Sequence, residues 1–184
     1  MMKETVKVGI IGSQFISTIH AESLMRCQSA EMLAVASPSV GNAKSFAAKH
    51  DIPHHFIDYR ELLAMAEIDM VVIGIPNHVH CEAVVAAAEA GKHIVIEKPL
   101  CLNMEEADLM VEAAKKANVK LMYAEELCFA PKYVRLKQLL DSGALGKPTL
   151  IKQSEKHDGP HAPHFWDVEQ RGGGVVRDMG CHAI

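Results

Sequence analysis

The sequence predicts an α/β fold built on a doubly wound parallel sheet with helices on both faces. Short apolar runs alternate with helix-like segments from Val6 to Tyr123, the connections between them are short, and the first run ends at Gly12 before a helix-like segment. Strands of such a sheet are apolar throughout because helices cover both of their faces. The alternation and the apolar runs together therefore favour this fold class over an antiparallel sheet.

Six apolar runs predict the strands; five segments between them and one after the last strand predict the helices. The expected strands cover residues 6–11, 32–36, 55–57, 70–75, 93–97 and 119–123. The expected helices cover residues 16–26, 42–50, 59–66, 79–90, 104–117 and 131–141. Turn-forming residues separate these elements, such as Ser37-Pro38 after the second strand and Pro76-Asn77 after the fourth.

Several helix ends carry recognisable capping residues. Asp58 is expected to cap the helix that begins at Tyr59, because its side chain can accept a hydrogen bond from a free N–H of the first turn. Asn103 with Glu106 three residues later resembles a capping box. Gly91 follows the fourth expected helix, where a left-handed residue commonly ends a helix.

The character of the chain changes after Gly146. Thr149 to Gln153 predict a strand that enters a new unit, and the following stretch is rich in His, Gly and Pro and contains the single tryptophan, Trp166. Such a composition is typical of an active-site loop rather than of a core element.

Composition and charge exclude several classes of protein. Hydrophobic residues make up 49% of the 184 residues and charged residues 23%, which predicts a packed globular core. The net charge of −4 leaves no basic surface for nucleic acid. No apolar run is long enough to span a membrane, and the N-terminus does not resemble a signal peptide. The cysteines are scattered without a C-x-x-C pair, which predicts reduced thiols in a cytoplasmic protein and no structural zinc.

The loop after the first strand resembles a dinucleotide-binding turn with two of its three glycines missing. The pattern G-x-G-x-x-G becomes Gly12, Gln14 and Ser17. Gly12 can form the tight turn and Ser17 is small enough for close helix packing, whereas Gln14 must turn outward or contact the phosphates itself. The N–H groups at the start of the following helix can bind an anion. An ordinary strand-to-helix turn is the alternative.

The end of the second strand bears on the choice of cofactor. A carboxylate in this region would bind the ribose hydroxyls of NAD and repel the 2′-phosphate of NADP. The chain has Ser37, Pro38 and Ser39 there, so NADP is permitted, although Lys44 is the nearest cation and no Arg is present. A plain turn without cofactor contact is the alternative.

Two further motifs follow strands and therefore lie at the carboxyl edge of the sheet, where such folds bind ligands. They are "GIPNHVH" and "IEKPL". Lys98 in the second motif could bind a substrate hydroxyl and stabilise developing alkoxide charge, against the alternative of a solvated surface lysine.

The C-terminal motif "GGGVVRDMGCHAI" holds a candidate acid–base pair. Asp178 and His182 are four residues apart and would share one face of a helix. A histidine suits proton abstraction, and a carboxylate can fix its tautomer. A loop histidine with a nearby capping aspartate is the alternative.

These motifs together resemble the Gfo/Idh/MocA family, the dehydrogenases related to glucose–fructose oxidoreductase and inositol dehydrogenase. The resemblance rests on the glycine loop with its trailing His20, on "PNHVH", on "EKPL" and on "GGGVVRDMGCH". It implies a Rossmann domain over residues 1–124. Residues 125–184 would then form a connecting helix and the beginning of an α+β domain with an open antiparallel sheet.

The resemblance also implies a function and a set of site residues. The protein would transfer a hydride between NAD or NADP and a sugar, cyclitol or related alcohol, and the full-length protein would form a homo-oligomer. Lys98 would polarise the oxygen, His182 would accept the proton, and Asp178 would orient the substrate or His182. The cofactor would contact Gly12, Gln14, Phe15, Ile16, Ser37, Pro76, Asn77, His80, Glu97 and Lys98.

Two departures from the family pattern affect these expectations. The family often has Asn and Arg where this chain has Glu126 and Cys128, so Glu125 and Glu126 would stand near the nicotinamide side. Their spacing to His157, His161 and His164 is not diagnostic of a metal site, and we expect none. Only the start of the second domain is present, so we expect a fragment whose open site binds cofactor weakly and turns over poorly.

Two other functions remain open at this point. Some relatives of the family are NAD-dependent glycosidases, so a hydrolase or lyase that uses transient oxidation without net redox is one alternative. A non-catalytic nucleotide sensor is the other, although a sensor does not need the proton-transfer set of Lys98, Asp178 and His182.

Overall fold

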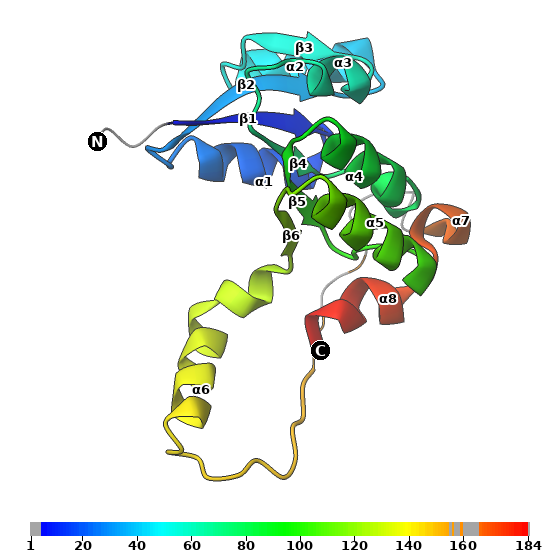
Figure 1. Cartoon of the computed structure of the whole chain (residues 1–184). Coiled ribbons are helices and arrows are strands. Elements are labelled where there is room, and N and C mark those ends of the chain that lie inside the picture. The colour runs from blue at the N-terminus through cyan, green and yellow to red at the C-terminus, as the bar shows by residue number, and fades with distance from the viewer. Residues whose placement is uncertain (1–4, 155, 157–158, 160–165, 184) are drawn as a thin grey trace.

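The computed structural model describes residues 5–154, 156, 159 and 166–183. Six parallel strands form one sheet in the order β3-β2-β1-β4-β5-β6 (Figure 1). The strands are β1 (Val6–Ile11), β2 (Ala30–Ala36), β3 (His54–Phe56), β4 (Met70–Ile73), β5 (His93–Glu97) and β6 (Leu121–Ala124). The direction in which strands are added reverses between β1 and β4, so the carboxyl ends of these two strands border a crevice. The predicted doubly wound parallel sheet is confirmed.

Helices cover both faces of the sheet, as predicted. They are α1 (Phe15–Leu24), α2 (Val40–Lys49), α3 (Tyr59–Leu63), α4 (His80–Glu89) and α5 (Met104–Lys116). On one face Leu62, Val84 and Met110 from α3, α4 and α5 pack against buried strand residues. On the other face Ala21 and Phe46 from α1 and α2 do the same. The longest helix has 13 residues, and no helix in the described ranges is long and apolar enough to cross a bilayer.

The predicted capping interactions are present. The Asp58 side chain accepts a hydrogen bond from Arg60 N at 2.9 Å, and Asn103 Oδ1 accepts one from Glu106 N at 2.8 Å. Glu106 in turn accepts a hydrogen bond from Leu102 N at 2.8 Å, so the first turn of α5 is held from both sides. Gly91 has a φ of 72° and follows the C-cap residue of α4, Ala90, as expected of a helix-terminating glycine.

The turn after β1 depends on a close backbone approach. Gly12 has a φ of +113°, and a Cβ atom there would lie 2.1 Å from the carbonyl oxygen of Gly74, which follows β4. A Cβ on Gly74 would in turn lie 3.0 Å from Ser17 Oγ. Ser17 is 1% exposed. Ser17 therefore packs closely here because the neighbouring strand supplies a glycine.

Beyond β6 the chain leaves the sheet and returns to it. The short helix η2 (Glu126–Phe129) leads into α6 (Pro131–Asp141), which has no buried residue and projects away from the sheet (Figure 1). The chain returns through α7 (Val168–Arg171), α8 (Val175–Gly180) and η4 (Cys181–Ala183), which lie near the α5 side of the sheet.

The strand expected over residues 149–153 is a correction. These residues have no regular secondary structure, and the described chain shows no antiparallel sheet. Leu150 and Ile151 are 74% and 76% exposed. A strand forms only when another strand pairs with it, and no segment of the described ranges does so here. His157, His161 and His164 lie outside the described residues.

The close approach at Gly12 leads to a stability prediction. Gly12→Ala should lower the free energy of unfolding by about 2 kcal/mol or more, because the new methyl group meets a backbone oxygen at a positive φ. Gly41→Ala is the matched control, since an added Cβ there meets nothing within 4 Å and α2 gains helix propensity. Urea denaturation of both variants measures the difference. A Gly12→Ala protein as stable as wild type would contradict this account of the turn.

Candidate functional site

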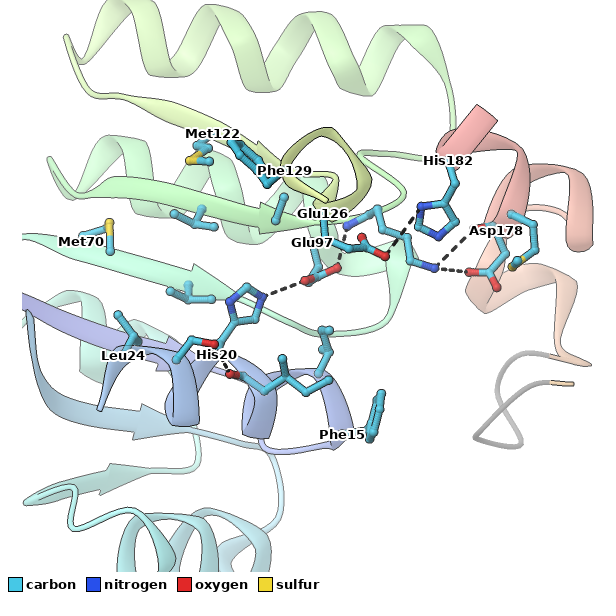
Figure 2. Close-up of a pocket in the computed structure, with 18 residues that line it drawn as sticks. Phe15, His20, Leu24, Met70, Glu97, Met122, Glu126, Phe129, Asp178 and His182 are labelled. Carbon is cyan, nitrogen blue, oxygen red and sulfur yellow. Dashed lines mark hydrogen bonds and ion pairs between the residues drawn. The ribbon is translucent and has the colours of Figure 1, made fainter. Parts of the chain in front are cut away.

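A pocket of about 710 Å³ lies along the face of β4, β5 and β6 that α1 borders (Figure 2). Its lining comes from α1, from these strands and from the segments after β5 and β6, and comprises Phe15, Ile16, Ile19, His20, Ser23, Leu24, Met70, Val72, Val95, Glu97, Lys98, Met122, Ala124, Glu126, Phe129, Asp178, Met179 and His182. Leu24 and Met70 lie at one end, whereas Asp178 and His182 lie at the other. The polar end coincides with the carboxyl edge of the sheet, where folds of this class bind ligands.

The start of α1 forms one wall of this pocket. Phe15 is 64% exposed and lines the pocket together with Ile16. Gln14 precedes the helix, is exposed, and makes no side-chain capping hydrogen bond. Ser13 Oγ and Ser37 Oγ are 2.8 Å apart, which connects the loop after β1 to the end of β2. The loop residues predicted to hold a cofactor therefore lie together at the switch point.

His80 connects two loops from inside the core. It is fully buried, with Nε2 2.9 Å from Ile75 O and Nδ1 3.0 Å from Pro99 O. Burial lowers the pKa of His80 below its ordinary value of 6.5, and the carbonyl contacts act in the opposite direction. Its contacts are thus with the loops after β4 and β5, which carry Pro76, Asn77 and Lys98, so it positions these residues rather than facing the pocket.

Glu97 at the end of β5 is held from two sides. His20 Nε2 on α1 is 2.7 Å from Glu97 Oε1, and Glu97 Oε2 accepts a hydrogen bond from Lys98 N at 3.0 Å. The Glu97 side chain is 9% exposed and the His20 side chain 22%. The pair connects α1 to the strand end and fixes the wall beneath the polar end of the pocket.

Lys98 forms an ion pair with Asp178 across 80 residues of sequence. Lys98 Nζ lies 3.2 Å from Asp178 Oδ1 and 3.3 Å from Asp178 O (Figure 2). The side chains are 20% and 15% exposed, so the pair is partly shielded from water. Lys98 is therefore not a solvated surface lysine, which was the alternative interpretation of the sequence.

The glycine-rich segment and Arg177 hold α8 against the loop after β5. Gly172 has a φ of +69°, and a Cβ there would lie 2.4 Å from Leu102 Cδ2. Arg177 donates to the carbonyl oxygens of Cys101, at 3.4 Å, and of Leu102. Glycine suits this position because its φ lies in the left-handed region that other residues rarely adopt.

His182 has a carboxylate partner other than Asp178. His182 Nδ1 lies 2.7 Å from Glu125 Oε1, and the two side chains are 7% and 10% exposed. The spacing of Asp178 and His182 suggested a pair on one helix face. In the structure α8 ends at Gly180, and Asp178 and His182 each have a partner from the sheet edge.

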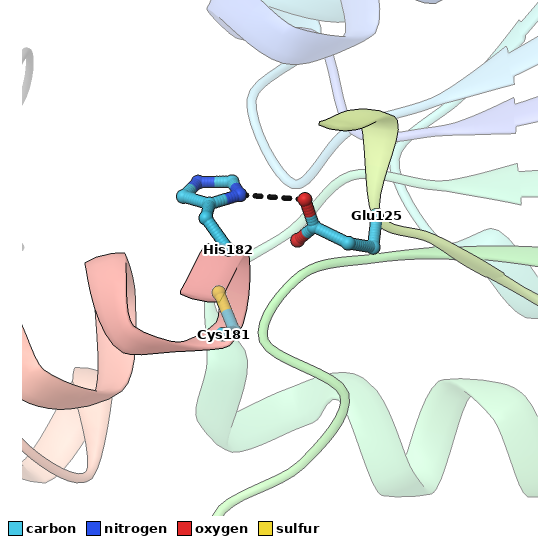
Figure 3. A group of neighbouring side chains, drawn as sticks. All are labelled: Glu125, Cys181 and His182. Atoms are coloured by element: carbon cyan, nitrogen blue, oxygen red, sulfur yellow. Dashed lines mark hydrogen bonds and ion pairs between the residues drawn. The ribbon is translucent and has the colours of Figure 1, made fainter. Parts of the chain in front are cut away.

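The neighbouring donors Glu125, Cys181 and His182 are the described group closest to a metal-binding geometry (Figure 3). One ligand atom of each lies within 4.8 Å of the others. Burial raises the pKa of the Cys181 thiol, and Cys181 Sγ donates to Asp178 O at 3.2 Å. A metal requires the thiolate. Burial disfavours the thiolate, and the imidazole and carboxylate already bind each other, so the absence of a metal at these residues stays a prediction.

The structure thus brings together Lys98, Asp178, His182 and Glu97 in one pocket, beside Phe15 and Ile16 at the start of α1. Sequence reasoning missed the partnership of Glu125 with His182, for which the only signal was the unusual "EELCFAP" segment. It also missed Gly74, although a glycine at the end of an apolar strand is itself a signal of close backbone approach.

Comparisons with known proteins give the same fold and a family. Residues 6–125 match a family described as "Oxidoreductase family, NAD-binding Rossmann fold", and residues 133–184 match the GFO/IDH/MocA C-terminal domain. The chain is 31% identical to myo-inositol 2-dehydrogenase of Thermotoga maritima over 96% of this chain and 52% of the relative. It is 31% identical to trans-1,2-dihydrobenzene-1,2-diol dehydrogenase of Xenopus tropicalis over 97% of this chain and 54% of the relative.

The solved structures that are similar to this chain also include a dehydrogenase. A levoglucosan dehydrogenase in complex with NADH and levoglucosan superposes with a TM-score of 0.87 at 28% identity. The match covers 98% of this chain and 52% of that chain. This chain therefore spans about half the length of the relatives and structures that it matches.

The buried His80 contacts lead to the second prediction. His80→Leu should lower the free energy of unfolding by about 1–3 kcal/mol, because a buried carbonyl group loses the ring N–H that donates to it. His55→Leu is the control, since His55 is exposed on β3 and should change stability by less than about 0.5 kcal/mol. Urea denaturation of both variants measures this.

The pH dependence of the same variant gives an independent check. Because the folded-state pKa of His80 is lowered, the unfolded state binds more protons below the ordinary value of 6.5. Wild type should therefore lose stability as the pH falls from 7 toward 5, and His80→Leu should lose less over that interval. Identical slopes in the two proteins would contradict this assignment.

Proposed function

The chain belongs to the GFO/IDH/MocA family of oxidoreductases with an NAD-binding Rossmann fold, and from this premise we propose that it forms the cofactor and catalytic half of a dehydrogenase of cyclic alcohols. The reaction moves a hydride between a nicotinamide cofactor and a carbon that bears a hydroxyl group. The observation that carries the proposal is the ion pair of Lys98 and Asp178 beside His182 at the polar end of the pocket.

The chemistry of these three side chains fits alcohol oxidation. The Lys98 ammonium donates to the substrate oxygen and stabilises the negative charge that develops as the hydroxyl loses its proton. His182 accepts that proton. Asp178 holds Lys98 in place and compensates its charge in a partly buried site. The hydrogen on the same carbon leaves with its electron pair, and a bound nicotinamide supplies the acceptor for this hydride.

The loop residues fit a dinucleotide. The tight turn at Gly12 leaves no room for a side chain, and the ten-residue helix α1 presents its free N–H groups beside it. Gly12, Gln14, Phe15 and Ile16 would hold the pyrophosphate and nicotinamide side. The exposed position of Gln14 favours an outward side chain over a required phosphate contact.

The adenosine side of the cofactor site is less selective. We infer contacts from Ser37, Pro76 and Asn77, which follow β2 and β4 at the switch point. Residues 37–39 contain no carboxylate that would repel a 2′-phosphate. The chain therefore accepts NAD or NADP in this proposal.

The substrate class follows from the relatives and from the pocket. The substrates in the names of the relatives, myo-inositol, levoglucosan and a dihydrobenzenediol, all carry hydroxyl groups on a ring. The polar end of the pocket presents Lys98, Asp178, His182 and Glu126, whereas its remaining lining from α1 and the strands is largely apolar. A ring with hydroxyl groups on one edge matches this division, so we propose a sugar or cyclitol as substrate.

Lys98→Met tests the proposal. The full-length protein is incubated with NAD or NADP and with myo-inositol, scyllo-inositol or levoglucosan, and cofactor reduction is followed by its near-UV absorbance. Lys98→Met should lower turnover by about 10²-fold or more, because alkoxide charge is no longer stabilised. The rise in melting temperature that the cofactor produces should fall far less.

Lys116→Met is the matched control, since Lys116 lies exposed on α5 outside the pocket lining. It should keep both turnover and the thermal shift. Turnover without net cofactor reduction would instead support the hydrolase or lyase that uses transient oxidation. A Lys98→Met protein with wild-type turnover, or a protein that neither cofactor stabilises, would overturn the proposed function.

A further inference from the structure

Glu125 forms a buried pair with the histidine that we propose as the proton acceptor. We propose that Glu125 is the positioning residue of His182, which holds the imidazole with Nδ1 protonated and leaves the Nε2 lone pair for the substrate. This inference rests on the proposed function for the role of His182. The tautomer itself is a property of the chain alone and is tested separately.

The geometry of the pair is that of a strong hydrogen bond. His182 Nδ1 and Glu125 Oε1 are 2.7 Å apart, which is within the range of charge-assisted bonds between nitrogen and carboxylate. The side chains are 7% and 10% exposed, so water competes little for either partner. Low local polarity strengthens such a bond.

Local structure holds Glu125 in place independently of His182. It follows β6 and caps the short helix η2, where Oε1 accepts a hydrogen bond from Leu127 N at 3.2 Å. The carboxylate therefore has a defined orientation at the sheet edge. His182 contacts it from η4, the short helix that follows α8.

The donor and acceptor roles follow from the chemistry of the two groups. An ionised carboxylate only accepts hydrogen bonds, so the proton between Oε1 and Nδ1 belongs to the imidazole. A neutral imidazole has one N–H, so Nε2 then carries a lone pair. His182 lines the pocket whereas Glu125 does not, and no described residue forms a hydrogen bond with Nε2. The basic nitrogen is thus the one that remains for substrate.

The other nearby carboxylates do not fill this role. Glu126 Oε1 lies 3.9 Å from Nδ1, beyond hydrogen-bond distance, and its side chain is 64% exposed. Asp178 Oδ1 pairs with Lys98 Nζ. The polar end therefore contains two separate charged pairs. Asp178 holds Lys98, and Glu125 holds His182.

The pair also explains how the site tolerates the proton that His182 takes up. When the substrate O–H bond breaks, its proton goes to Nε2 and the Nδ1 proton stays on the ring. The resulting imidazolium faces the buried carboxylate at 2.7 Å. Glu125 Oε2 is buried and has no hydrogen-bond partner among the described residues, so the negative charge of this carboxylate is compensated mainly by the groups that contact Oε1. Glu125 itself gains no proton in this step.

The tautomer of His182 in this chain decides the proposal. Long-range ¹H–¹⁵N spectra of ¹⁵N-labelled protein at alkaline pH distinguish a protonated Nδ1 from a protonated Nε2. Wild type should show the Nδ1–H form. Glu125→Met keeps the length of the side chain but removes the acceptor, and His182 should move to the Nε2–H form that a free imidazole prefers.

Two further variants make the test specific. Glu126→Met changes the neighbouring carboxylate in the same way and should leave the Nδ1–H form unchanged. Glu125→Gln retains a carbonyl oxygen that can accept from Nδ1 and should restore that form at least in part. A buried side chain with only a packing role would give the same tautomer in all four proteins.

An Nε2–H signal in wild type would overturn the inference, because Glu125 would then be protonated and donating or would not bond the ring. This readout needs no variant to fold and no substrate to be known. It is also separate from the cofactor-reduction assay, so an Nδ1–H tautomer in a protein without dehydrogenase activity would leave the pair intact and reject only the proposed function.

Discussion

The ion pair of Lys98 with Asp178 is the contact on which the site depends, because it joins two parts of the chain that share no apolar core. Lys98 directly follows β5, whereas Asp178 lies on α8, a helix without a buried residue. Polar contacts therefore hold α8 in place, namely this pair, the hydrogen bonds of Arg177 to the loop after β5, and the pair of His182 with Glu125. A partly exposed ion pair contributes only about 1 kcal/mol by itself, so the three contacts must act together.

The sheet supplies the rigidity that these polar contacts need. His80 anchors the loops after β4 and β5 from the interior, and His20 holds Glu97 from α1. Lys98 thus projects from a strand end whose neighbours on both sides are fixed. A site built on strand ends is more precise than one built on free loops, because the backbone hydrogen bonds of the sheet set the position of each side chain.

The fold could be predicted because its signals are local, whereas part of the site could not. Apolar runs, Asp58 and Asn103 each reveal an element within a few residues of sequence. Lys98 and Asp178 were found through their motifs, but the pairing of Glu125 with His182 depends on how α8 docks, 57 residues later in the chain. The strand expected over 149–153 was wrong for the same reason, since pairing requires a second segment that the local sequence does not contain.

The two pairs at the polar end also explain why one site can bear so many charges. Lys98 faces Asp178, and in the proposed reaction this ion pair is neutral before and after hydride transfer. In the proposed reaction, the pair of His182 and Glu125 carries one negative charge before the reaction and becomes neutral when His182 takes the substrate proton. Proton uptake thus removes a net charge from a buried position, where an uncompensated charge is costly. This charge balance is the reason why we propose His182, rather than Lys98, as the proton acceptor.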